Sequence, residues 1–143
     1  MYAYETDGFG NYTLMDDANV PSLLSIPYLG YTAPDSKLYQ NTRNYILSKD
    51  NPFYFEGKVA KGIGSPHTPE NYIWHIALSM QGLTAATKEE KLAIIDTVLK
   101  TDADTGFMHE GFHVDDPAQF TRPWFAWSNS LFAELVYNVY FAE

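Results

Sequence analysis

Residues 68–83 read TPENYIWHIALSMQGL, and they carry the strongest structural signal in the chain. The order Thr68, Pro69 and Glu70 is typical of a helix start, with the threonine as the N-cap and the acid in the first turn. Hydrophobic residues then recur at the spacing of one buried helical face, at Ile73, Ile76, Ala77 and Met80. These residues therefore predict a helix that runs from Thr68 to about Leu83.

Helical signals continue on both sides of this stretch. Thr87 and Glu90 have the spacing of a capping box, and Asp35 can cap a helix that ends near Ser48. The other expected helices span about 20–29 and 124–141, and Trp127 is assigned to the core of the last one. Strand signals are weak, and only Phe53–Phe55 looks extended. The predicted fold is all-α, with about five helices and long functional loops.

Composition narrows the classes of function. The 143 residues suit one domain, and 45% hydrophobic residues with 19% charged residues exclude a disordered chain. A net charge of -9 without any basic run argues against a nucleic-acid partner. No apolar run is long enough for a membrane span, and no leader precedes one, which slightly favours the cytoplasm but leaves the compartment open. Without cysteine, thiolate metal sites and disulfides are excluded.

Aromatic residues are abundant, with three Trp, eleven Tyr and nine Phe. Aromatic rings beside carboxylates suit sugars, because a ring can stack on the C–H face while acids and amides bind the hydroxyls. An aromatic-rich core explains the same count equally well. The residues that could contact a sugar lie in loops and at expected helix starts: Asp16, Asp17, Asn19, His67, Arg122 and Trp124.

Each of these candidates also has a purely structural interpretation. Asp17 or Asn19 could simply cap the helix expected after Val20. His67 could hold backbone carbonyls in its loop. Arg122 could pair with Asp115 or Asp116 instead of presenting donors to a ligand.

The segment from His109 to His113 matches the zinc pattern H-E-x-x-H, and Glu134 could supply a third ligand. That interpretation needs both histidines on one face of a helix, with Glu110 as general base. The flanking glycines and the following Asp-Asp-Pro make a poor helix. The alternative is a catalytic carboxylate, Glu110, in a loop lined by apolar side chains.

Several ordered blocks together resemble the C-terminal part of glycoside hydrolase family 125, the metal-independent exo-α-1,6-mannosidases. The blocks are 4–11, 15–31, 42–43 with 46–48, 51–57, 62–68, 105–112, 115–117 and 120–131. Two positions depart from the family pattern: Gly111 stands in place of an expected serine and Ser128 in place of an alanine. Residues 1–143 would then be an incomplete portion of one catalytic domain.

The resemblance implies part of an (α/α)6 barrel and an inverting hydrolysis of terminal α-1,6-linked mannose, without metal or other cofactor. It implies Glu110 as the general base, whereas the family's acid is an aspartate from a block that this chain lacks. It also makes His109 a candidate for substrate contact. The expected partners are a mannose-containing oligosaccharide and the remaining polypeptide of the domain or an oligomeric partner. The alternatives are the zinc hydrolase and a non-catalytic carbohydrate-binding piece.

Overall fold

Helices and short antiparallel strands alternate along the chain. The computed structural model describes residues 1–142, and within them it contains four helices and seven strands. In chain order these elements are β1 (Glu5–Thr6), β2 (Tyr12–Thr13), α1 (Lys37–Ile46), β3 (Tyr54–Glu56), β4 (Lys61–Ile63), β5 (Tyr72–Trp74), α2 (His75–Leu83), α3 (Lys88–Leu99), β6 (Gly111–His113), β7 (Asp116–Phe120) and α4 (Ala126–Tyr140).

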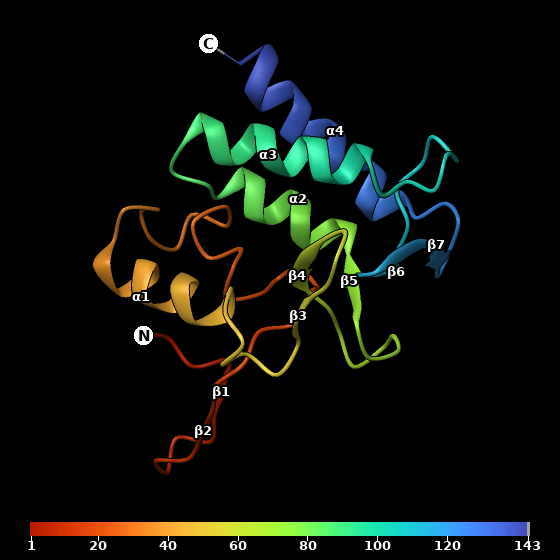
Figure 1. Ribbon diagram of the computed structural model, residues 1–143. Helices are drawn as coiled ribbons and strands as arrows, with labels where there is room; N and C mark the ends of the chain where they lie inside the picture. Colours follow the sequence, from red (N-terminus) through yellow and green to blue (C-terminus); the bar gives the residue numbers. More distant parts are fainter. Residues whose placement is uncertain (143) are drawn as a thin grey trace.

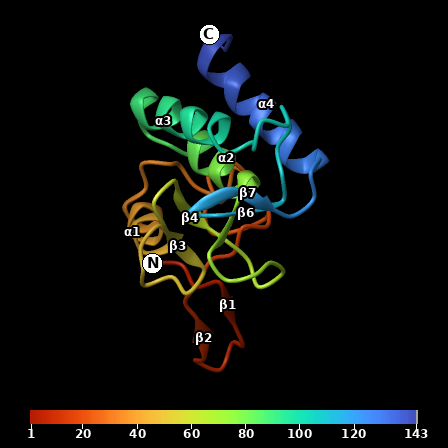
Figure 2. The same ribbon diagram turned by 45° about the vertical axis from the view of Figure 1, so that its right-hand side comes forward.

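Helices α2, α3 and α4 pack on one another at one end of the molecule, and the β1–β2 hairpin projects from the opposite end (Figures 1 and 2). Helix α2 lies at the centre, and seven of its nine residues are buried. One core cluster joins α2, α3 and α4 to strands β5 and β6, around Ile73, Val98, Phe112 and Leu135. A second cluster joins α1 and the N-terminal segment to the other side of α2.

The expected all-α fold, as part of an (α/α)6 barrel, is wrong for this chain. The structure is mixed α/β, with 32% of the residues in helices and 15% in strands. The strands are only two to five residues long, so none of them contains a full alternating pattern that a sequence window could detect. They form two hairpins, β1–β2 and β3–β4, and the three-stranded sheet β5–β6–β7.

The helix predicted from Thr68 begins only at His75. The residues before it, Tyr72–Trp74, form strand β5, in which Tyr72 pairs with His113 and Trp74 with Gly111. Asn71 has a φ of 66°, which is incompatible with a continuous helix. The β-branched and aromatic residues gain more from pairing with β6 than from helix formation, so the tertiary contact overrides the local start signal.

The remaining helix predictions have mixed outcomes. The predicted start of α3 is confirmed, because the Thr87 hydroxyl accepts a hydrogen bond from the Glu90 amide, although the Glu90 carboxylate binds Arg43 and Gln81 and does not complete a capping box. Helices α1 and α4 lie within their expected ranges, although the N-cap position of α1 is Ser36 instead of Asp35, and the Ser36 side chain makes no capping hydrogen bond. The extended segment at 53–55 is confirmed by β3. No helix forms over residues 20–29, where two prolines lack amide donors and the chain makes successive turns.

Gly64 allows three segments to meet, and its replacement tests this packing. Its amide donates to Phe53 and its carbonyl accepts from Ala18, and a Cβ would overlap the Tyr72 carbonyl oxygen. We expect Gly64→Ala to lower the free energy of unfolding by about 2–3 kcal/mol, because a backbone atom cannot move aside as a side chain can. Gly62→Ala is the control, since its Cβ would meet only side-chain atoms, the nearest being those of Leu78 at 3.1 Å and Ile73 at 3.5 Å. If urea unfolding showed that both variants lose the same free energy of unfolding, this account would be wrong.

Candidate active site

The β6–β7 hairpin brings Glu110 and Arg122 together. Glu110 directly precedes β6 and Thr121 directly follows β7, and the Glu110 amide donates to the Thr121 carbonyl at 3.2 Å. The Thr121 amide in turn donates to the Gly111 carbonyl at 2.8 Å. The strand register therefore fixes two positions that are eleven residues apart in sequence, and Arg122 follows immediately.

Both carboxylate oxygens of Glu110 have partners. The Thr121 hydroxyl donates to Oε1 at 3.1 Å, and Arg122 Nε lies 3.0 Å from Oε2. The Glu110 side chain is only 14% exposed. Arg122 has a φ of 50°, and its guanidinium carbon lies 5.4 Å from the centre of the Phe125 ring. The carboxylate is thus held in one orientation by a hydroxyl and a cation, and a bulky residue with positive φ is a frequent feature of functional sites.

A cavity of about 700 Å³ opens at this position. Glu110 is its one carboxylate among the described residues. The other lining residues offer an amide, an imidazole, a guanidinium and several aromatic rings: Asn19, His67, Trp74, Arg122, Trp124, Phe125, Ala126 and Trp127. Five of the eight residues proposed from the sequence therefore lie together, namely Asn19, His67, Glu110, Arg122 and Trp124.

Asp16 and Asp17 are not among the residues that line the cavity, and their carboxylates bind amides of the segment that carries Asn19. The fully buried Asp16 carboxylate accepts from the Leu23 and Leu24 amides, each at 2.9 Å. Burial raises the pKa of Asp16 to about 7, because it outweighs the opposing effect of the backbone amides. Asp17 Oδ1 accepts from the side-chain amide of Asn19 at 2.9 Å and from its backbone amide at 2.7 Å. Asp17 therefore orients Asn19 toward the cavity.

His109 is also buried, and its ring connects two loops. Its Nδ1 lies 3.0 Å from the Pro123 carbonyl oxygen and its Nε2 lies 3.0 Å from that of Asp102. The ring stacks on Phe120 at a centroid distance of 3.9 Å. Its backbone amide donates to Nδ1 of buried His75, and burial lowers the pKa of His75 to about 3, with a further contribution from His109. His109 thus supports the loop that carries Glu110.

The donor geometry of a zinc site is not present. His113 lies in strand β6, so it is not one helical turn from His109, and both ring nitrogens of His109 already face carbonyl oxygens. Glu134 accepts a hydrogen bond from Tyr28 on a different part of the surface. Among residues 1–142, no three His, Asp or Glu side chains converge as metal ligands would. The positions of these side chains therefore do not support a zinc site at His109, His113 and Glu134.

Two further placements differ from expectation. Trp127 was assigned to the core, but it is 60% exposed and lines the cavity. His67 does not stand at a helix start, because the helix predicted from Thr68 begins only at His75. Trp74, Phe125 and Thr121 were not proposed from the sequence. The proximity of Trp127 to Trp124, only three residues away in sequence, was a signal that could have identified Trp127.

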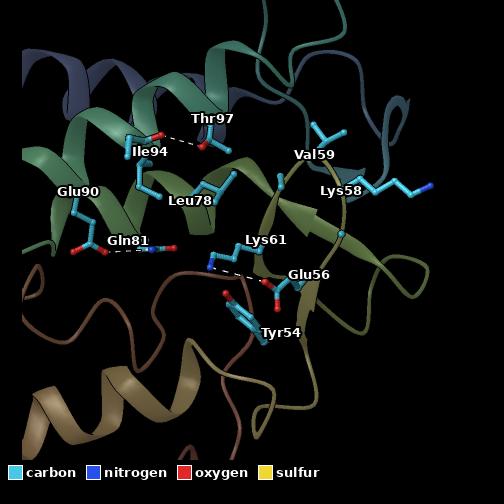
Figure 3. Close-up of a pocket in the computed structure, with 13 residues that line it drawn as sticks. Tyr54, Glu56, Lys58, Val59, Lys61, Leu78, Gln81, Glu90, Ile94 and Thr97 are labelled. Carbon is cyan, nitrogen blue, oxygen red and sulfur yellow. Dashed lines mark hydrogen bonds and ion pairs between the residues drawn. The ribbon is translucent and has the colours of Figure 1, made fainter.

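A second cavity, of about 420 Å³, lies between the β3–β4 hairpin and helices α2 and α3 (Figure 3). Its two carboxylates are both paired within the protein: Glu56 with Lys61 at 3.9 Å, and Glu90 with Gln81 at 3.2 Å and with Arg43 at 2.7 Å. It contains none of the residues proposed from the sequence. Because both of its carboxylates are already paired, it is a weaker candidate for catalysis than the Glu110 cavity.

No helix among the described residues combines the length and the apolar character that crossing a membrane requires.

Comparison with known proteins identifies close relatives. A solved structure from Streptococcus pneumoniae, described as a metal-independent alpha-mannosidase in a non-productive complex with alpha-1,6-mannobiose, is 54% identical with a TM-score of 0.95. The match covers 96% of this chain and 32% of that chain. The meiotically up-regulated gene 157 protein of Schizosaccharomyces pombe is 49% identical over 140 residues, which cover 97% of this chain and 28% of that protein. The chain thus spans about a third or less of the length of these relatives.

The family profile described as metal-independent alpha-mannosidase (GH125) matches residues 1–137, which include the hairpin and every residue that lines the Glu110 cavity. This chain therefore belongs to glycoside hydrolase family 125.

Proposed function

We propose that this chain supplies the general base and part of the sugar-binding surface of an inverting exo-α-1,6-mannosidase. The observation that carries the proposal is Glu110, a nearly buried carboxylate that Thr121 and Arg122 orient at the wall of a cavity rich in aromatic and hydrogen-bonding groups. The alpha-1,6-mannobiose bound to the pneumococcal relative supports the substrate class.

Inverting hydrolysis requires two carboxyl groups about 6.5–9.5 Å apart, with room for a water molecule between the base and the sugar. In the proposed reaction Glu110 removes a proton from water while the water oxygen attacks the anomeric carbon. A carboxylic acid on the other side gives a proton to the departing glycosidic oxygen. The described lining of the cavity has one carboxylate. We therefore propose that the acid comes from polypeptide beyond these 143 residues, and that the chain acts together with it.

Arg122 and Asn19 have supporting roles in this proposal. The Arg122 guanidinium keeps the Glu110 carboxylate oriented and offers further donors to sugar oxygens. Asn19, held by Asp17, presents an amide that can both donate and accept hydrogen bonds with hydroxyl groups.

A chimera in which this chain replaces the matching segment of the pneumococcal relative tests the proposal. We expect a folded chimera to cleave alpha-1,6-mannobiose, and NMR at early times to show β-mannose as the first product, because inversion converts an α-linkage into a β-anomer. The isolated chain should give negligible turnover. Initial α-mannose, or no turnover by a chimera with native circular dichroism, would refute the proposal. Equal turnover by the isolated chain would place the acid within it.

A second candidate is a carbohydrate-binding role without catalysis. It is supported by the single carboxylate in a cavity that otherwise offers only binding groups. Calorimetric binding of mannose by the chain, together with an inactive but folded chimera, would favour this alternative.

A further inference from the structure

Trp127 lies at the first turn of α4, where the helix meets the Glu110 cavity. Its indole is 60% exposed, although a large aromatic side chain usually gains by burial. It lines the same cavity as Glu110 and Arg122. An exposed indole at the wall of a cavity, on a rigid helix, is suited to contact a ligand.

Three aromatic rings form a connected row along this wall. The ring centres of Trp127 and Phe125 are 5.5 Å apart with planes inclined at 40°. Phe125 in turn contacts Trp74 edge-on, at 6.3 Å and 88°. Trp74 is itself fixed, because its Nε1 donates to the Thr68 hydroxyl at 2.9 Å. Trp127 is therefore the exposed end of an aromatic series that is anchored in the core.

The same row is connected to the acid–base chemistry. Arg122 lies over the Phe125 ring and pairs with Glu110. A flat apolar surface beside charged and amide groups matches a hexopyranose, which has a C–H face and a rim of hydroxyls. We propose that Trp127 is a sugar-stacking residue that positions a mannose ring in the Glu110 cavity. This inference rests on the proposed function and extends it to a residue that the sequence had assigned to the core.

The competing explanation is that Trp127 belongs to a packing surface on the outer side of α4. Tyr137 and Phe141, near the C-terminal end of α4, are also exposed, and a smaller hollow of about 210 Å³ borders Trp127 next to Val20 and Leu131. Tyr137 provides the matched control. It is 62% exposed on the same helix, and it is not among the residues that line either hollow.

Calorimetric titration of the full chain with alpha-1,6-mannobiose tests the inference. We expect Trp127→Ala to weaken binding about 10-fold and Trp127→Phe to weaken it less than about 3-fold, because the phenyl ring keeps part of the stacking surface. Tyr137→Ala should bind like the wild type. The unfolding temperature of all three variants should stay within about 2 °C of the wild type, as for other surface substitutions.

Several results would overturn the inference. The inference fails if Trp127→Ala binds mannobiose as tightly as the wild type, or if Tyr137→Ala loses as much affinity as Trp127→Ala. It also fails if the wild-type chain shows no measurable binding of mannobiose. None of these results would by itself refute Glu110 as the base, because that role is measured by turnover and product anomer in the chimera. Conversely, a chimera that fails to hydrolyse while the chain still binds through Trp127 would refute the catalytic proposal alone.

Discussion

Glu110→Gln is expected to lower kcat of the chimera about 10³-fold with little change in KM. Glutamine retains the size of the side chain and can still accept a hydrogen bond from Thr121, but its amide cannot take a proton from water. General-base catalysis typically contributes 10²–10⁴ in rate, and the loss falls on the chemical step, not on binding. Initial rates of mannobiose cleavage provide the measurement.

Glu134→Gln is the matched control for this prediction. Glu134 lies on α4, accepts a hydrogen bond from Tyr28, and is not among the lining residues of the Glu110 cavity. Its replacement should leave kcat unchanged. If Glu110→Gln retained more than about a tenth of the wild-type rate, Glu110 would not be the base. If Glu134→Gln were the inactive variant, the site would have to be sought elsewhere.

The sequence identified chemical groups better than it identified their roles. Glu110, Arg122 and Asn19 lie in one cavity because a hairpin register and an Asp17–Asn19 contact bring them there. Their residue types suggested the chemistry, but only the fold shows the distances. Asp16 was indistinguishable from a ligand-binding acid in the sequence, because burial depends on residues such as Leu24 that pack around it in the tertiary structure.

Secondary structure was predictable where local signals agree with the tertiary environment. Thr87 caps α3 as expected, because the cap needs only its own helix. The error at residues 68–74 has the opposite cause, since β5 exists only through its pairing with β6, a segment about forty residues later. Short strands of this kind have no periodic signal of their own, and they are also what positions Glu110. The part of the fold that matters most for the site was therefore the least predictable.

The stability of the folded chain is expected to depend on pH through the buried carboxyl of Asp16. Its carboxyl is fully buried, and burial raises its pKa to about 7 from the ordinary value of 3.8. Between these values the folded chain keeps a proton that the unfolded chain has lost. The stabilising contribution of Asp16 is therefore complete below about pH 4 and is lost as the pH rises through about 7. The free energy of unfolding is expected to fall by up to about 4 kcal/mol between about pH 4 and pH 7.

Asp16→Asn removes the titration and tests this prediction. One of its side-chain positions becomes an amide donor that opposes the amide of Leu23 or Leu24, so the variant should be less stable than the wild type near pH 4. The deficit in the free energy of unfolding should be largest near pH 4. Between pH 4 and pH 7 the difference should shift in favour of the variant by up to about 4 kcal/mol, as measured by urea unfolding. Asp35→Asn, at an exposed position, should run parallel to the wild type.

A constant deficit of Asp16→Asn between pH 4 and pH 7 would contradict the prediction. It would mean that the Leu23 and Leu24 amides outweigh burial and keep the carboxylate ionised in the folded chain. The distinction matters for the site, because Asp16 closes the turn that follows Asn19. If the deficit does narrow, the turn is held by a neutral carboxyl below about pH 7, and deprotonation above that pH strengthens the two amide hydrogen bonds but leaves a buried charge.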